Sequence, residues 1–307
     1  MTNGLNLGYL VFEVRQLAAW EEFCTSTLGL AVSMQNSDGS HGYRLDAACH
    51  RLIVQSGRAD DLSALGFDCG DDATLDALLA RFDASTVQII PADQDLHAAR
   101  QVERLYLVKD PDGNTVELFT GLRRMAQPFS ASGFPGGFRT GALGIGHAVL
   151  VTHAIKRMED FYGSLLGFGV RERLDTRLGP VDLKGTFMHC NHRHHSIGLF
   201  DMPLRKKLQH FMLQANQQSD VGRAYERVRR HKVPLSLDMG QHSDGTFSFY
   251  AATPSGFDFE IGSGCKELDT QGWEALKAAE TIAWGHQPQL RLRLKMAGEI
   301  LVNRFLG

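Results

Sequence analysis

Two parts of the chain share one order of apolar and polar positions. Residues 5–14 (LNLGYLVFEV) and 143–152 (LGIGHAVLVT) are both apolar and strand-like, with a glycine at the fourth position. Each is followed by a segment with helical spacing, 16–30 or 154–168, whose penultimate residue is a glycine suited to a helix C-cap. The chain therefore contains an internal repeat, in which Tyr9 falls opposite His147.

The two copies also end alike. Residues 110–121 (DPDGNTVELFTG) and 253–264 (TPSGFDFEIGSG) each contain a Pro-x-Gly turn that leads into a strand. Six residues separate the proline from a glutamate in both copies, so Glu117 falls opposite Glu260. The middle of each copy holds an apolar strand and then a helical stretch, at 62–69 and 72–84 in the first and at 207–215 and 220–232 in the second. We therefore expect each copy to run strand, helix, several strands, and then the same again.

Residues 126–141, rich in Gly, Pro and Ser, form the predicted linker between the copies. We expect an N-terminal module over 1–135, a C-terminal module over 136–268 and a helical tail over 269–307. The last part of this tail, 290–307, combines apolar residues with four basic side chains. This part is predicted to be an amphipathic helix that packs on its own module, at a subunit contact or on a membrane surface.

Composition narrows the class of protein. The 307 residues carry 32 Lys and Arg and 35 Asp and Glu, a net charge of -3 that favours neither nucleic acid nor an anionic membrane. The five cysteines are an odd number without a disulfide spacing, which indicates reduced thiols. The first residues lack the pattern of a signal peptide, and no apolar run is long enough for an integral membrane segment. We expect a cytoplasmic protein.

A set of metal-binding side chains occupies repeat positions in the second copy alone. The residues at equivalent positions are Tyr9, Leu65 and Glu117 in the first copy and His147, His210 and Glu260 in the second. Two imidazoles and one carboxylate on neighbouring strands match the facial set of ligands that leaves open positions on an Fe(II) centre. The pattern predicts one metal ion per chain, in the second module.

Residues 189–195 (HCNHRHH) hold four histidines and a cysteine in seven positions. Imidazole and thiolate both bind zinc. In an extended segment, however, His192 and His194 would face one side and His189 and His195 the other. No CxxC or HxxxH spacing brings Cys190 into a zinc arrangement. The residues alone leave metal binding, acid–base chemistry and surface roles open.

The sequence resembles the type I extradiol ring-cleavage dioxygenases of the vicinal oxygen chelate fold, above all the members that act on bicyclic catechols of the 2,3-dihydroxybiphenyl or 1,2-dihydroxynaphthalene type. The resemblance covers about residues 5–288. It is carried by LGIGHAVL, FMHCNHRHHSIGLF, LQHFMLQA, GQHSDGTFSFYAATPSGFDFEIG and WGHQP. It implies an α+β fold of two tandem modules, each of paired βαβββ repeats that form a curved mixed sheet around a funnel.

The resemblance also implies a role for each site residue. The metal ligands would be His147, His210 and Glu260, holding Fe(II), with Mn(II) as the other candidate. The catalytic residues would be His195, His242 and Tyr250, with His195 as acid–base group, which leaves the other histidines of the cluster to packing or to support of His195. Substrate contacts are expected from Val149, Phe187 and Ile197, by proximity to the motifs, and from Asp244, although the loop after His242 is one residue shorter than in the family.

The implied activity is meta cleavage of a catechol with insertion of both atoms of O2, in aromatic compound degradation. Catechol and O2 are the expected partners, and we expect a homo-oligomer. A metal-dependent isomerase or lyase of the same fold is an alternative, but such enzymes usually share four ligands between modules, and Tyr9 and Leu65 cannot contribute. A non-catalytic sequestering protein is the other alternative, and it would not need His195, His242 and Tyr250.

Overall fold

The computed structural model describes residues 4–36, 38–178, 181–268, 276–278, 281–290, 292–294 and 297–299. The first sheet contains β1 (Asn6–Val14), β2 (Val32–Gln35), β3 (His41–Tyr43), β4 (Leu52–Ser56), β5 (Asp61–Asp68), β6 (Ile89–Pro91), β7 (Arg104–Lys109) and β8 (Thr115–Thr120). The second contains β9 (His147–Val151), β10 (Gly169–Leu178), β11 (Val181–His189), β12 (Ile197–Asp201), β13 (Leu208–Gln214), β14 (Leu235–His242), β15 (Phe247–Ala252), β16 (Asp258–Ser263), β17 (Leu276–Ala278) and β18 (Ile282–Gly285).

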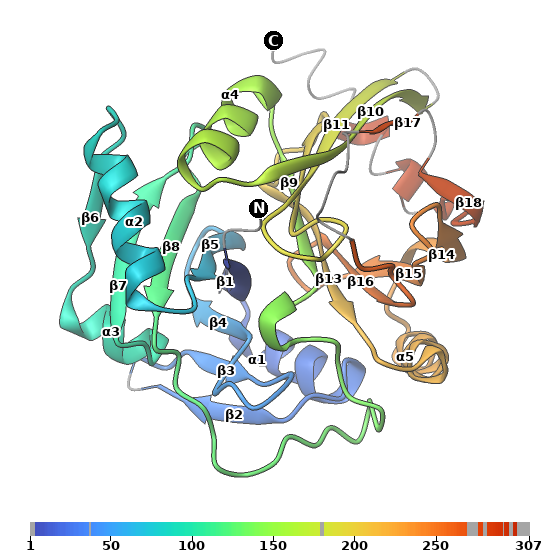
Figure 1. Cartoon of the computed structure of the whole chain (residues 1–307). Helices are drawn as coiled ribbons and strands as arrows, with labels where there is room; N and C mark the ends of the chain where they lie inside the picture. The colour runs from blue at the N-terminus through green and yellow to red at the C-terminus, as the bar shows by residue number, and fades with distance from the viewer. Residues whose placement is uncertain are drawn as a thin grey trace.

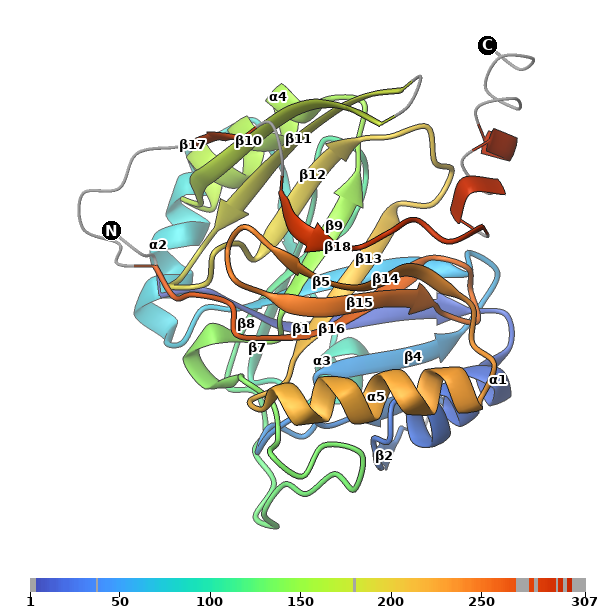
Figure 2. The same cartoon turned by 90° about the vertical axis from the view of Figure 1, so that its right-hand side faces the viewer.

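Both sheets are built from two βαβββ repeats. The strand order is β2-β3-β4-β1-β5-β8-β7-β6 in the first sheet, and the second has the same order over β10-β11-β12-β9-β13-β16-β15-β14. Each sheet contains both parallel and antiparallel pairs, so both are mixed. Figures 1 and 2 show the second sheet curving, with β10 and β11 on one side and β14 and β15 on the other. The α+β fold of paired βαβββ repeats is confirmed.

The helices connect the strands within each repeat. They are α1 (Leu17–Glu22), α2 (Asp72–Asp83), α3 (Gln94–Arg100), α4 (Ile155–Asp160) and α5 (Gln218–Arg230), with short turns at η1 (Phe23–Thr27), η2 (Gly141–Leu143) and η3 (Phe161–Leu165). Both α1 and α4 continue into a π turn, η1 and η3, and both segments end beside a glycine with positive φ, Gly29 at 71° and Gly167 at 72°. The predicted C-cap glycines therefore hold the equivalent place in the two modules.

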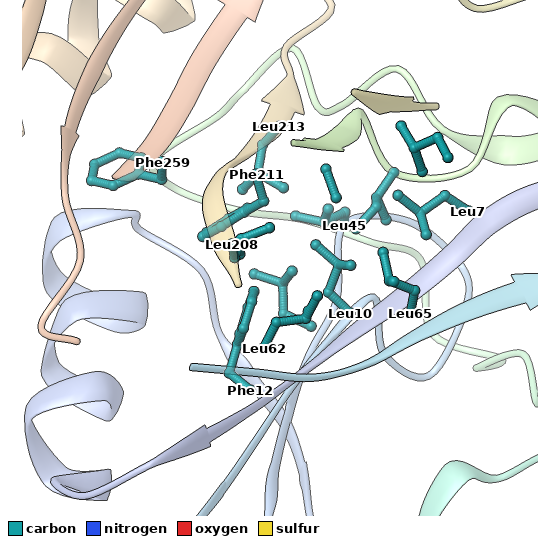
Figure 3. Close-up of a cluster of buried hydrophobic side chains, with 14 of the residues drawn as sticks. Leu7, Leu10, Phe12, Leu45, Leu62, Leu65, Leu208, Phe211, Leu213 and Phe259 are labelled. Carbon is teal, nitrogen blue, oxygen red and sulfur yellow. The ribbon is translucent and has the colours of Figure 1, made fainter. Parts of the chain in front are cut away.

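The two modules share one hydrophobic core. Phe12 of β1 packs against Phe211 of β13 and Phe257, with ring centroids 5.1 and 5.4 Å apart. Figure 3 shows side chains of the first module, among them Leu10 and Phe12, facing Phe211 and other side chains of β13. Because this cluster is continuous, the second sheet is held in place by the first as well as by its own helices.

The segment after residue 268 differs from the expected helical tail. Its described residues include two short strands, of which β17 pairs with β10 and β18 pairs with β14 at the opposite edges of the second sheet. Within this segment, the described residues are helical only from residue 290 onward. Residues 300–307 of the predicted amphipathic helix lie outside the described residues. Within the described part of the chain, no helix combines the length and the apolar character needed to cross a membrane.

Replacing Phe12 with alanine tests the shared core. Phe12→Ala should lower the free energy of unfolding by about 3–5 kcal/mol, since it leaves a cavity between the modules. Urea denaturation followed by fluorescence and circular dichroism measures this loss. Val32→Ala, at a position that is 37% exposed, is the control and should change stability by less than about 0.5 kcal/mol. A loss below about 1 kcal/mol for Phe12→Ala would contradict a shared core.

Candidate metal centre

Strand register brings the three predicted ligands together. His147 of β9 pairs with Met212 of β13, and Met212 pairs with Glu260 of β16, so these residues form a row across three neighbouring strands. His210 lies two residues before Met212 on β13 and therefore projects from the same face. The predicted set from two histidines and one glutamate is thus assembled by the central strands of the second sheet.

The ligand atoms of this set converge in the interior of the protein. The two Nε2 atoms of His147 and His210 lie 3.0 Å apart, and they lie 3.2 and 3.5 Å from Oε2 of Glu260. All three residues are buried. Among the described residues, neither carboxylate oxygen of Glu260 has a hydrogen-bond partner.

The arrangement fits a divalent metal ion. Adjacent ligand atoms that each lie about 2.1 Å from one ion are about 3 Å apart, the spacing of these nitrogens and oxygens. Burial would raise the pKa of Glu260, but the surrounding imidazoles hold it well below its ordinary value, and burial lowers the pKa of His147. A buried carboxylate that faces two imidazole nitrogens and has no hydrogen-bond partner among the described residues therefore suits a bound cation.

Among the described residues of the first module there is no such set. Tyr9 of β1 pairs with Gly66 of β5, and Gly66 pairs with Glu117 of β8, which is the same row as in the second module. The residue equivalent to His210 is therefore Ala64, and the predicted equivalence of Leu65 was wrong by one position. Leu65 faces the shared core, whereas Ala64 packs in a small apolar cluster with Tyr9. Alanine, like leucine, offers no ligand atom.

In the first module, Glu117 forms an ion pair with an arginine. The guanidinium of Arg100, at the end of α3, donates from Nε and Nη2 to both carboxylate oxygens of Glu117 at 2.9 and 3.0 Å. The hydroxyl of Tyr9 donates to Oε2 of Glu117 at 2.6 Å. Arg100 is 4% exposed and Glu117 is 1% exposed, so this pair is buried. Arg100 supplies the positive charge that a metal ion would supply. The sequence comparison did not predict this role of Arg100, because α3 has no counterpart in the second module.

The histidine cluster does not act as one group. His189 contacts the carbonyl of Asn191, and His192 contacts the carbonyl of Leu268. His195 alone reaches the predicted ligands, with its ring centroid 4.0 Å from that of His147. Its Nδ1 lies 3.1 Å from Nδ1 of His194, and burial, followed by His147 and His194, holds the pKa of His195 well below its ordinary value.

His194, His195 and Asp244 form a second group of potential ligands, whose atoms lie within 4.8 Å of one another. Nδ1 of His194 is 4.0 Å from Oδ2 of Asp244, a longer distance than any between the ligand pairs described above. That distance exceeds the spacing of about 3 Å expected between adjacent ligands of one ion, so this group fits a metal less well than His147, His210 and Glu260 do.

Two side chains hold the loop that carries His195. Arg193 is 5% exposed and donates to the carbonyls of Leu143 and Gly144 at 2.8 and 3.1 Å. The amide of Asn191 donates to the carbonyl of Leu5 at 3.3 Å. The sequence analysis did not predict this role for Asn191 or Arg193, although both lie among the histidines of residues 189–195.

His242 and Tyr250 lie beside Glu260. Tyr250 pairs with Glu260 across β15 and β16, and its hydroxyl is 2.8 Å from Nε2 of His242. Nδ1 of His242 donates to the carbonyl of Thr281 at 3.1 Å, so Nε2 accepts the proton of the Tyr250 hydroxyl when His242 is neutral. Burial, followed by Glu260, raises the pKa of Tyr250 well above its ordinary value. This pair was predicted from the motif, and the structure brings it to the edge of the set of ligands.

The predicted substrate contacts fall into two groups. Val149 pairs with His210, and Phe187 lies with its ring 4.4 Å from that of His195, so both are beside the site. Ile197 pairs with Ala148 and Met188, all three of which pack in the hydrophobic core, so the contact predicted for Ile197 was wrong. Strand alternation explains the error, because Gly198 and not Ile197 shares the face of Val149.

Further apolar side chains extend this wall. Leu174 and Phe200 are buried with Val149, and Phe187 packs against the same cluster. A two-residue step from Gly198 along β12 reaches Phe200, which is the signal in the sequence that would have found it. Asp244 is engaged by its own loop, since its Oδ1 accepts the backbone N–H of Thr246 at 2.8 Å and its Oδ2 contacts the thiol of Cys265.

Paired βαβββ modules with a buried His–His–Glu set in one of them define the class, the vicinal oxygen chelate proteins. Residues 144–261 match the model of the Glyoxalase/Bleomycin resistance protein/Dioxygenase superfamily, and residues 7–57 match that of the Dihydroxybiphenyl dioxygenase BphC D1 domain. Within this class, the chain belongs to the extradiol dioxygenases.

Three relatives illustrate the likeness. The chain is 36% identical to biphenyl-2,3-diol 1,2-dioxygenase of Pseudomonas sp. (strain KKS102), over 92% of this chain and 96% of the relative. It is 32% identical to an iron-dependent extradiol dioxygenase of Rhodococcus jostii (strain RHA1), over the same shares. The crystal structure of BphC, a halotolerant catechol dioxygenase, superposes with a TM-score of 0.85 at 31% identity, covering 94% of this chain and 96% of that one.

The two equivalent glutamates give a matched pair of variants. Glu260→Gln should lose most of the bound iron, because the amide cannot supply the anionic ligand. Glu117→Gln should keep its iron, yet lower the free energy of unfolding by about 3–5 kcal/mol, because Arg100 is left buried without its counter-charge. Metal analysis and thermal denaturation of both variants measure this difference. Equal iron loss in both, or two irons per wild-type chain, would contradict the assignment.

Proposed function

We propose that this protein cleaves the ring of a catechol beside its two hydroxyl groups and inserts both atoms of O2, at an Fe(II) ion held by His147, His210 and Glu260. The observation that carries the proposal is the buried carboxylate of Glu260, which faces two imidazole nitrogens and has no hydrogen-bond partner among the described residues. The iron-dependent relative supports iron, and Mn(II) accepts the same ligands. Bound Fe(II) would have open positions for both catechol oxygens and O2 and would let electrons pass from one to the other.

His242 and Tyr250 orient the substrate in this proposal. The hydroxyl of Tyr250 remains protonated because burial raises its pKa, and it donates to Nε2 of His242. Its oxygen can then accept a hydrogen bond from a catechol hydroxyl. The carbonyl of Thr281 fixes which nitrogen of His242 carries the proton, so the acceptor is in place before the substrate arrives.

His195 moves a proton. Its low pKa makes the imidazole neutral, so it can take the proton of a catechol hydroxyl and later return it to an oxygen atom derived from O2. Its ring lies against His147 on one side and Phe187 on the other, which places it beside the ligands without making it one of them. Phe187 and Val149 also exclude water from this side of the site.

An apolar wall supports a substrate with a second ring. Val149, Leu174, Phe187 and Phe200 lie together on the face of the sheet that carries the ligands, and a hydrophobic wall of this size suits an aromatic substituent. The relative that is named for biphenyl-2,3-diol supports a bicyclic catechol. The carboxylate of Asp244 shapes the loop between β14 and β15 in this proposal and does not contact the ring directly. The isomerase alternative lacks support, since Ala64 and Tyr9 add no fourth ligand.

We also propose how the protein is organised. The two sheets support a division into an N-terminal module over 1–135 and a catalytic module over 136–268, with β17 and β18 as extensions of the latter. Exposed apolar side chains near the C-terminal end, including Trp284 and Leu290, support a homo-oligomer. The five free cysteines support a reducing compartment such as the cytoplasm.

Labelled oxygen tests the reaction. With Fe(II) and ¹⁸O₂ the protein should convert 2,3-dihydroxybiphenyl or 1,2-dihydroxynaphthalene into a yellow meta-cleavage product that contains two labelled atoms, as measured by mass spectrometry. Both atoms are expected because the proposal joins O2 to a single substrate molecule. Incorporation of one atom, or an ortho-cleaved diacid, would rule the reaction out.

His195→Ala separates proton transfer from metal binding. The variant should keep its iron and bind catechol, while turnover falls about 100-fold to 10,000-fold, the usual contribution of a positioned acid–base group. His192→Ala is the control from the same cluster, because His192 contacts only the carbonyl of Leu268 among the hydrogen bonds described above, and its turnover should change little. Loss of iron in His195→Ala would show that this histidine is a ligand.

A further inference from the structure

We propose that His286 is a positioning residue that fixes the ring plane of His242 against the hydroxyl of Tyr250. The assignment rests on the substrate-orienting role proposed above for that pair. His286 belongs to the WGHQP motif and follows directly after β18, outside the repeated part of the chain. The mechanism described above does not use it.

His286 contacts both members of the pair. Its ring stacks on that of His242, with centroids 4.3 Å apart and planes at 27°, and it meets the ring of Tyr250 edge-on at 5.5 Å. The side chain is buried, with 1% of its surface exposed. A ring packed flat against His242 blocks rotation of that imidazole and so keeps Nε2 of His242 at the Tyr250 hydroxyl.

The ring of His286 is itself anchored. Nδ1 of His286 donates to the carbonyl of Asp238 on β14 at 3.0 Å, just as Nδ1 of His242 donates to the carbonyl of Thr281 next to β18. Each histidine is thus tied to the backbone at its Nδ1 atom, and the two rings lie on one another where β14 and β18 pair. A phenylalanine could supply the stack, but it could not make the bond to Asp238.

The backbone around His286 is arranged to admit this ring. His286 has φ of 49°, an unfavourable conformation for a residue other than glycine, and Gly285 before it has φ of 72°. Gly240, which pairs with Gly285, has no room for a side chain, because a Cβ atom there would lie 2.4 Å from the backbone nitrogen of His286, 2.6 Å from the carbonyl oxygen of Trp284 and 2.7 Å from Cγ of His286. An ordinary core position needs neither the left-handed histidine nor this glycine.

One ring atom of His286 also lacks a partner. Its Nε2 is buried and accepts no hydrogen bond from any described residue. Burial, and then the neighbouring His242, lowers the pKa of His286 to about 4, so the ring is uncharged at neutral pH. A neutral ring stacks on His242 without placing a positive charge beside it. The ring of His286 therefore contributes one stack, on His242, and one hydrogen bond, from Nδ1 to the carbonyl of Asp238.

Steady-state kinetics with 2,3-dihydroxybiphenyl test the proposal. His286→Leu, which removes the stack, should raise KM and lower kcat/KM about 10- to 100-fold with iron content unchanged, since a small misplacement of an orienting group has effects of this size. His286→Phe should recover part of the loss. In a His242→Ala background, His286→Leu should change kcat/KM less than about 2-fold, because the effect passes through His242. A full effect in that background, or none in the wild type, would overturn the proposal.

A second measurement does not depend on turnover. In full-length protein loaded with diamagnetic Zn(II), the ¹⁵N resonance of Nε2 of His242 should carry the shift of a hydrogen-bonded acceptor in the wild type and lose it in His286→Leu, where the ring can turn away from the Tyr250 hydroxyl. Unchanged resonances would overturn the proposal. If the wild type did not cleave the catechol but the resonances changed, the proposed function would fail while the positioning role stood.

His50 offers a matched control. It is a buried histidine of the first module whose Nε2 also lacks a partner among the described residues, and it packs edge-on against Tyr9 at 5.5 Å. His50→Leu should therefore alter stability in the same range as His286→Leu, while leaving kcat/KM and the resonances of His242 as in the wild type. A fall in kcat/KM as large as that of His286→Leu would show that the effect is general loss of packing.

Discussion

A buried carboxylate needs a positive charge beside it, and the two modules satisfy this requirement in different ways. Glu117 and Glu260 occupy the same position in the same strand of equivalent sheets, and both are 1% exposed. Arg100 binds Glu117 with two parallel hydrogen bonds, so the first module carries its own cation. Glu260 faces imidazoles that cannot neutralise it while they stay uncharged. The second module therefore needs an ion from solution, and that ion gives the site its chemistry.

The duplicated sheet decides which groups surround this ion. His147, Met212, Glu260 and Tyr250 lie in one row across four strands, so the orienting hydroxyl is beside the carboxylate ligand by register alone. The acid–base group comes from outside the row, on the loop that Arg193 ties to the segment before β9. A strand that follows the repeat completes the site. Thr281, whose carbonyl accepts from His242, directly precedes β18 in the sequence, and His286 directly follows it. Residues far along the chain from the metal ligands thus hold in place the side chains that would contact the substrate.

The repeat predicted the order of strands and helices and the ligand positions, and the family resemblance implied the fold class and the approach of His195, His242 and Tyr250. Errors came from local register. The pairing of Tyr9 with Gly66 makes Ala64, and not Leu65, the counterpart of His210, and the alternation of β12 turns Ile197 into the core. Arg100 and β18 lie where the two modules differ, so comparison of the copies could not reveal them. The orphaned Nε2 of His286 depends on packing that no sequence pattern records.

The central claim is that one cation lies among His147, His210 and Glu260, and that Arg100 takes its place in the first module. A crystal structure of the protein reconstituted with Fe(II), with data collected on both sides of the iron absorption edge, tests this most directly. The account predicts one anomalous peak per chain, within bonding distance of those three side chains, and none beside Glu117. A peak next to Glu117, or iron bound by His194, His195 and Asp244 in place of the predicted ligands, would contradict it.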